Sequence, residues 1–212
     1  MYYICGMNRA KQLSVWLSRI RKCRGFGVQS PFAYRLIRYV INEHYPYYAY
    51  KELAATVSGI GRTERKLCRL YFRLANDTQA SVWINVAESS PLQMENAVCQ
   101  YIRRGCAKTE VLNFSSGVIA SSSCDDAFDA SQLQVVRLVL EGHFQQSYQY
   151  ILNKVGEKTI LVLEGIRLRR DTKKFWKDVV HDKRTGVTFD LYDCGIVFFD
   201  KKRTKQHYVV NF

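Results

Sequence analysis

The sequence predicts an α/β protein built on a doubly wound, mostly parallel sheet that closes with antiparallel strands. A repeated pentapeptide is the first observation, because Leu138–Gly142 and Leu161–Gly165 share the same three apolar residues followed by glutamate and glycine. Between the two runs, apolar residues from Phe144 to Val155 recur at helical spacing. Strand, helix and strand of this length form a βαβ unit, so the two runs should lie parallel and adjacent. The second observation is that strand and helix patterns alternate from residue 81 onward.

Residues 1–76 are predicted to form a basic, helical N-terminal region that packs on the sheet domain of residues 77–212. A first amphipathic helix is expected because one apolar stripe recurs at helical spacing among basic residues. The stripe consists of Leu13, Trp16, Leu17 and Ile20.

A second helix is predicted to start at Ser30, a favoured N-cap residue followed by proline, and to continue to Ile41. Residues 44–50, with one proline and four tyrosines, are predicted to form a loop. Thr63 can then cap a third helix.

Seven strands are predicted in the sheet domain, at residues 81–87, 110–114, 135–141, 159–164, 187–192, 196–199 and 207–212. Helices are expected at residues 90–105, at 144–155, and from Asp171 or Thr172 to Val180. Gly117–Ser131 is rich in serine and aspartate and has little periodicity, so it is predicted to be a loop.

The composition indicates a globular protein, because 212 residues with 47% hydrophobic content can bury a core. No apolar run is long enough to span a membrane, and the first residues lack the pattern of a signal peptide. The seven cysteines include no C-x-x-C pair, which argues against a zinc site or a disulfide framework. These features predict a cytoplasmic protein with reduced thiols.

The positive charge is concentrated near the N-terminus. Residues 1–73 contain 14 Lys and Arg against 3 Asp and Glu, a net charge of +11, whereas residues 74–158 have a net charge of −3. Such asymmetry can mark a surface for nucleic acid or acidic lipid, or a solvated face that keeps the protein soluble. The residues expected to contact RNA, if RNA is bound, are Arg19, Arg21, Lys22 and Arg24.

Several motifs resemble those of small class I S-adenosylmethionine-dependent methyltransferases of the O-methyltransferase type. They are the N-terminal stretches 25–32, 47–50 and 70–76 and the closing segment 190–199 with 206–208. The resemblance covers most of the chain and implies a Rossmann-like domain with antiparallel closing strands. These are motifs of the scaffold and do not carry the reaction.

The parts that would hold the coenzyme depart from that family's pattern. The loop after the first strand should be glycine-rich, but here the matching positions Asn85, Ala87, Glu88, Ser89 and Ser90 include no glycine. The second strand ends at Asn113–Ser116 without the acid that normally holds the ribose. About twenty residues separate Ser116 from Val135, too few for two crossovers and a third strand. The fold is therefore expected to be truncated around the third strand.

The candidate catalytic residues are Glu141, His143 and Glu164, which correspond to the family's acidic positions after its fourth and fifth strands. They could bind a divalent cation or act as a base. Alternatively, the two glutamates close their strands and meet Arg167, Arg169 or solvent.

Three functional hypotheses follow. The favoured one is a degenerate methyltransferase-fold protein that does not turn over S-adenosylmethionine, has no cofactor and binds an unidentified protein or small molecule. The second is an active methyltransferase that uses S-adenosylmethionine with an unusual loop. The third is a basic RNA-associated protein. The closing strands and the tyrosine cluster at 45–50 could also bury a homodimer contact.

Overall fold

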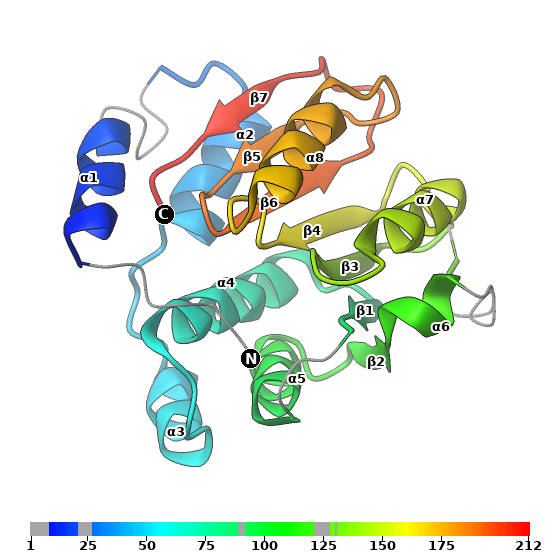
Figure 1. The fold of residues 1–212 in the computed structure, drawn as a ribbon. Helices are drawn as coiled ribbons and strands as arrows, with labels where there is room; N and C mark the ends of the chain where they lie inside the picture. The colour runs from blue at the N-terminus through cyan, green and yellow to red at the C-terminus, as the bar shows by residue number, and fades with distance from the viewer. Residues whose placement is uncertain (1–8, 21–26, 89–91, 121–127, 130) are drawn as a thin grey trace. The chain divides into compact units, whose positions relative to one another are not determined.

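The computed structural model describes residues 9–20, 27–88, 92–120, 128–129 and 131–212 (Figure 1). The chain forms two compact units. The first comprises residues 1–79, 91–108 and 209–212, and the second comprises residues 80–90 and 109–208. None of the helices in the described ranges is long and apolar enough to cross a membrane.

The first unit is helical. Its elements are α1 (Arg9–Arg19), α2 (Pro31–Leu36), the π-helical turn η2 (Ile37–Ile41), α3 (Tyr48–Thr56), α4 (Arg62–Thr78) and α5 (Leu92–Gly105). α4 and α5 pack closely, because a Cβ at Gly105 would collide with the carbonyl oxygen of Phe72. Arg73 also stabilises this unit, since its guanidinium donates to the carbonyl oxygens of Val40 and Ile41.

The second unit contains the sheet. Its elements are β1 (Val82–Val86), β2 (Glu110–Phe114), α6 (Ser116–Ala120), β3 (Gln134–Val139), α7 (Phe144–Lys154), β4 (Ile160–Glu164), α8 (Arg170–His181), β5 (Thr188–Asp190), β6 (Cys194–Phe198) and β7 (His207–Val209). The strand order is β2-β1-β3-β4-β6-β5-β7. β2, β1, β3 and β4 pair in parallel, whereas β6 pairs antiparallel with β4 and β5. This arrangement confirms the predicted fold class.

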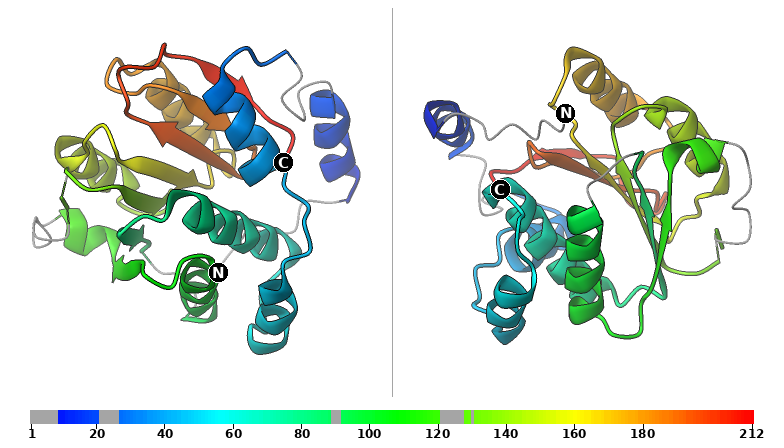
Figure 2. Two further views of the ribbon diagram at one scale, coloured as in Figure 1. Left: turned by 180° about the vertical axis from the view of Figure 1, so that it is seen from behind. Right: turned by 60° about the horizontal axis from the view of Figure 1, so that its bottom comes forward.

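The repeated pentapeptides lie side by side, as predicted. Leu138 of β3 is paired with Leu163 of β4 in a parallel register, and α7 connects the two strands. Alternate strand residues form one apolar cluster with α7 and α8, which lie on the same face of the sheet (Figures 1 and 2). Ile84, Val136 and Leu161 lie at the centre of this cluster and are fully buried.

Some predicted elements were wrong. Tyr48–Thr56 is the helix α3, although residues 44–50 were expected to form a loop, because the run from Tyr48 onward has good helix formers that the tyrosine cluster obscured. The predicted second helix changes to π geometry at Ile37, where the amide of Asn42 donates to the carbonyl of Ile37 at 2.9 Å.

Two other boundaries also differ. α4 begins at Arg62, one residue before the expected cap Thr63, because the Glu64 carboxylate accepts from the backbone amide of Gly61. The predicted loop 117–131 begins with residues of α6, a five-residue helix that is too short to show periodicity in the sequence.

Candidate functional site

The predicted site lies where the parallel strands of the second unit reach their carboxyl ends, the edge at which open α/β sheets bind ligands. Val86, the last residue of β1, pairs with Phe114 of β2 and with Leu138 of β3. The amide of Ala87 donates to the carbonyl of Phe114 at 3.1 Å, so the backbone ladder continues past the end of β1. Ser89 and Ser90 lie outside the described residues.

The loops after β1 and β3 meet through Glu88. Its carboxylate lies directly against Gly142, at the position that a Cβ of residue 142 would occupy. Gly142 has a φ of +51°, a conformation that L side chains rarely adopt, so the backbone favours glycine here, and any side chain at this position would displace the Glu88 carboxylate. The repeated glycine therefore provides space for Glu88, in addition to its role in the turn.

Glu88 also faces His143, with 3.8 Å between Oε1 and Nε2. The two side chains are 32% and 62% exposed, so this pair is partly solvated and forms an ion pair when the imidazole is protonated. The sequence had placed Glu88 in a coenzyme loop and His143 among catalytic candidates. The structure brings these two candidates together.

Glu141 forms the turn into α7. Its amide donates to the carbonyl of Val139 at 2.9 Å, and its carbonyl accepts from the amide of Phe144 at 3.2 Å. The residue is half-buried. Its position is thus set by backbone hydrogen bonds that close β3 and start the helix.

Glu164 occupies a different environment from the other candidates. Its carboxylate accepts a hydrogen bond from Nε of Arg137 at 2.8 Å, and the two side chains are 4% and 1% exposed. Arg137 stands in β3 beside Val162, and Glu164 stands in β4 beside Val139, so the pair spans the two strands diagonally. The sequence analysis missed Arg137 because it lies inside an apolar run. A buried arginine requires an acidic partner, which was the signal available.

The arginines proposed as partners of Glu141 and Glu164 bind other acids. Arg167 donates to Asp190 at 2.5 Å, and Arg169 forms an ion pair with Asp171 at 3.1 Å. Asp190 is 2% exposed in its side chain, so the Arg167 contact stabilises a second buried carboxylate.

The side chain of Asn85 is part of a short series of side-chain hydrogen bonds on the sheet. It is 1% exposed, accepts from the indole Nε1 of Trp83 at 3.0 Å and donates to Oδ1 of Asn113 at 2.9 Å. Asn113 is the penultimate residue of β2, near the position where the resembled family has its ribose-binding acid. The amide pair therefore links two expected coenzyme positions to each other.

No three His, Cys, Asp or Glu side chains in the described ranges are grouped closely enough to hold a metal ion. Glu141, His143 and Glu164 are accordingly not gathered around one point in this structure. Glu164 faces Arg137, whereas His143 faces Glu88.

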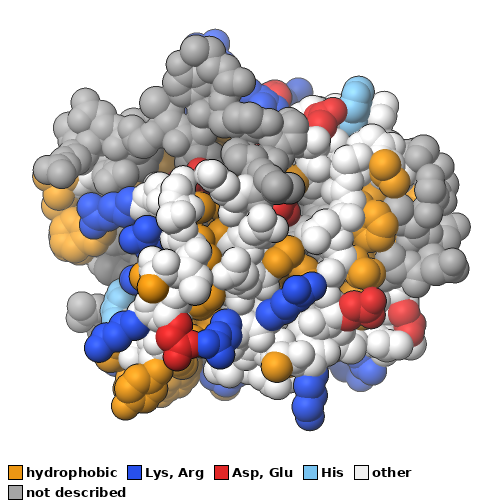
Figure 3. Space-filling view, turned by 90° about the horizontal axis from the view of Figure 1, so that it is seen from below, with side chains coloured by type: hydrophobic (Ala, Val, Ile, Leu, Met, Phe, Trp, Pro, Cys, Tyr) orange, Lys and Arg blue, Asp and Glu red, His pale blue; other side chains and the backbone are white. Residues whose placement is uncertain are grey.

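The basic residues proposed for RNA are only partly described. Arg19 is 7% exposed and donates from Nη1 to the carbonyl of Val210 at 3.2 Å, so its guanidinium faces inward. Arg21, Lys22 and Arg24 lie outside the described residues. On the face drawn in Figure 3, the Lys and Arg side chains of the described residues are spread among uncharged and apolar atoms.

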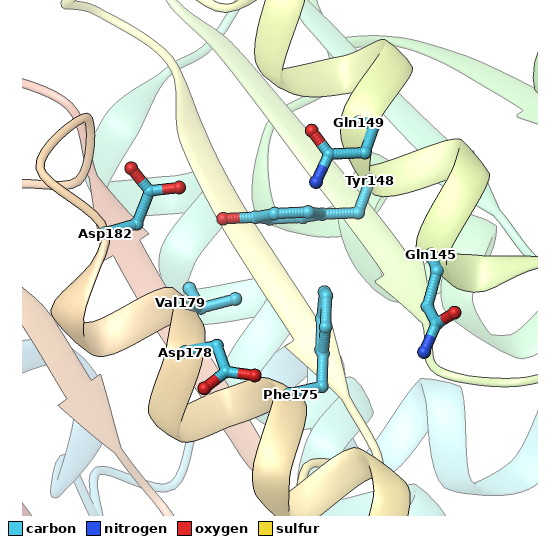
Figure 4. A pocket seen from close by; sticks show the side chains of 7 residues that line it. All are labelled: Gln145, Tyr148, Gln149, Phe175, Asp178, Val179 and Asp182. Atoms are coloured by element: carbon cyan, nitrogen blue, oxygen red, sulfur yellow. The ribbon is translucent and has the colours of Figure 1, made fainter.

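A groove between α7 and α8 has a volume of about 290 Å³. Figure 4 shows its lining residues, which are Gln145, Tyr148, Gln149, Phe175, Asp178, Val179 and Asp182. Burial raises the pKa of the Tyr148 hydroxyl, with a smaller contribution from the charge of Asp182. This hydroxyl is buried and has no hydrogen-bond partner in the described part of the chain.

Comparisons with known proteins gave structural matches alone, since no protein-family model and no curated protein matches the chain. One similar solved structure is the MycE methyltransferase from the mycinamycin biosynthetic pathway in complex with Mg and SAH, with 8% identity and a TM-score of 0.48. That match covers 73% of this chain and 50% of MycE, so this chain spans about half the length of that protein. A methyltransferase from Geobacter sulfurreducens is similar over 71% of this chain and 86% of its own, with 10% identity and a TM-score of 0.42.

Proposed function

We propose that this chain is a methyltransferase-like protein that does not turn over S-adenosylmethionine and acts by binding another molecule. The observation that carries the proposal is the contact of the Glu88 carboxylate with Gly142. A coenzyme held at this edge needs close approach to the backbone of the first loop, which glycine normally provides. Here the described end of that loop carries a side chain that closes against the loop after β3.

The β2 side of the edge also supports this proposal. An acid at the end of β2 would accept hydrogen bonds from ribose hydroxyls. Asn113 stands there instead, and its side-chain oxygen already accepts from Asn85. The chain then enters the five-residue helix α6, and β2 has one neighbouring strand in the described sheet.

An active S-adenosylmethionine-dependent methyltransferase is the second candidate, and the Glu88–His143 pair favours it. A carboxylate beside an exposed imidazole at a sheet edge can orient that ring as a base for a methyl acceptor. Under this alternative, Glu88 would be a functional side chain of the coenzyme loop. The two candidates therefore assign opposite roles to the same carboxylate.

Thermal unfolding of the full chain with S-adenosylmethionine or S-adenosylhomocysteine separates the two. A ligand present at about 100 times its Kd stabilises the native state by about 2.7 kcal/mol, which raises Tm by about 5–10 °C for a chain of this size. The binding-protein proposal predicts no shift at millimolar ligand. A shift of several degrees that Glu88→Ala abolishes, and that Glu157→Ala on an exposed loop retains, would show that this edge binds the coenzyme and would favour the second candidate.

A cytoplasmic location and a protein or small-molecule partner complete the proposal. Cys68, Cys106 and Cys194 are buried, which fits cysteines used as small apolar residues in a reducing compartment. Two alternatives are RNA association through the basic N-terminal region and formation of a homodimer. Both are outcomes of the vesicle-binding experiment described below.

A further inference from the structure

The helix α1 is held in the first unit by its polar side. The buried guanidinium of Arg19 donates to the carbonyl of Val210, and the side-chain amide of Asn211 donates to the carbonyl of Trp16 at 3.4 Å. Val15 lies one helical turn before Arg19 and is half-buried. The face that contacts the C-terminal segment is therefore the face of Val15 and Arg19.

The apolar stripe of α1 lies on a different face and is exposed. Leu13, Trp16, Leu17 and Ile20 are 57%, 47%, 54% and 44% exposed. Their spacing of three and four residues places them within an arc of about 100° on the helix. Most amphipathic helices of globular proteins turn such a stripe inward. Here the stripe is directed outward, which indicates a surface for a partner.

The sequence around this stripe has a single sign of charge. Residues 1–42 contain eight Lys and Arg and no Asp or Glu, and the first acid is Glu43. An occupant of the stripe must therefore be apolar where it meets the leucines and negatively charged around them. An anionic lipid bilayer has both properties, and tryptophan beside leucine is typical of helices that lie in its interface.

We infer that α1 is a membrane-docking helix that inserts Leu13, Trp16, Leu17 and Ile20 into the interface of an anionic bilayer. RNA matches the charge of the region and could stack a base on Trp16, but it gains nothing from the three exposed aliphatic side chains beside that ring. A second copy of the chain could cover the stripe, but it would bring a second set of basic residues to the contact with no acid among residues 1–42 to offset them. The bilayer is the occupant that satisfies both the apolar and the electrostatic observation. This inference does not depend on whether S-adenosylmethionine is turned over.

Vesicle binding by the full chain tests the inference through Trp16. Trp83 and Trp176 are 0% and 4% exposed, so a change of emission on binding reports mainly on Trp16. Phosphatidylcholine vesicles with and without 30% phosphatidylglycerol are the probes. With the anionic vesicles we expect a blue shift of the Trp16 emission and co-sedimentation of the chain. Binding should be at least about tenfold weaker with vesicles of phosphatidylcholine alone and at high salt.

Two variants with matched controls separate the apolar from the electrostatic contribution. Leu13→Ser with Leu17→Ser should lower vesicle binding at least about tenfold, whereas Leu168→Ser, an exposed leucine of the other unit, should leave it unchanged. Arg21→Gln with Lys22→Gln and Arg24→Gln should also weaken binding. The control for net charge replaces three exposed lysines of α8 by glutamine and should leave vesicle binding unchanged. These lysines are Lys173, Lys174 and Lys177.

Three results would overturn the inference. The first is vesicle binding that is absent or unaffected by the two serines. The second is salt-dependent binding to an RNA oligonucleotide that the charge variant loses and the serine variant retains, without vesicle binding. The third is a dimer in vesicle-free solution that the two serines dissociate. Circular dichroism and Tm of each variant must match those of the unchanged chain.

Discussion

The Arg137 guanidinium donates to the Glu164 carboxylate at 2.8 Å within the sheet, and both side chains are nearly inaccessible to solvent. The pair joins β3 to β4, the two strands that carry the repeated pentapeptide. A carboxylate bound in this way is a structural group of the sheet. It is not placed to act as a base for a ligand at the edge.

Removing one partner of this pair should destabilise the fold strongly. Arg137→Met leaves a buried carboxylate without its cation, and we expect a loss of about 3–5 kcal/mol in the free energy of unfolding. Arg137→Met combined with Glu164→Leu should recover most of that loss, because both buried charges are removed.

Urea unfolding monitored by circular dichroism measures both variants. Arg184→Met is the matched control, since Arg184 forms a partly exposed ion pair with Asp182 at 2.7 Å and should contribute less than about 1 kcal/mol. If Arg137→Met were no more destabilising than Arg184→Met, the buried pair would not have the assigned role.

The contact between Glu88 and Gly142 predicts that Gly142→Ala destabilises the fold and that Glu88→Ala partly reverses this loss. Gly142→Ala should lower stability by about 1–3 kcal/mol, because it strains a residue with positive φ and forces the Glu88 carboxylate away. Adding Glu88→Ala should restore the part due to the collision. Gly117→Ala in α6 is the control, because a Cβ there meets no atom within 4 Å and alanine favours a helix. Equal unfolding free energies for Gly142→Ala and Gly117→Ala would contradict the contact.

Tyr148 should make stability depend on alkaline pH. Burial raises the pKa of its hydroxyl in the folded state. The folded chain therefore keeps a proton that the unfolded chain releases, so this contribution is complete below the ordinary tyrosine pKa of about 10 and is lost as pH rises above it. Tyr148→Phe should flatten the fall of stability between pH 9 and about 11.

At pH 7, Tyr148→Phe should change stability by less than about 1 kcal/mol or increase it, because the removed hydroxyl has no hydrogen-bond partner in the described chain. Denaturant titrations at pH 7 and at alkaline pH measure both effects. Tyr39→Phe, at an exposed ring, is the control for the change of residue type. The assignment fails if the two phenylalanine variants have the same pH profile.

The fold was largely predictable from the sequence, because the parallel strands are apolar and alternate with helices. The pairing of Leu138 with Leu163 follows from the βαβ pattern. The helix α3 was not predictable, since its apolar spacing is weak and one of its residues, Leu53, is described as buried. Its conformation follows instead from the good helix formers of the run from Tyr48 onward, a signal that the tyrosine cluster obscured.

The candidate site was less predictable than the fold. The sequence could place Glu88, His143 and Glu164 at strand ends, but the side chains that meet there depend on strand register and loop conformation, which the sequence pattern does not give. Glu164 is still within β4 and faces Arg137 of the neighbouring strand, whereas Glu88 and His143 lie in the loops after β1 and β3 and face each other. Asn85 likewise binds Asn113 within the sheet.

Equilibrium dialysis of the full chain against labelled S-adenosylmethionine tests the central claim most directly. With the chain at about 100 µM, a coenzyme site with a Kd of about 10 µM would hold about nine tenths of a trace of label. We predict equal label on both sides of the membrane. Retention of label by the chain, lost in Glu88→Ala and kept in Glu157→Ala, would show that the edge above β1 and β3 is a functioning coenzyme site.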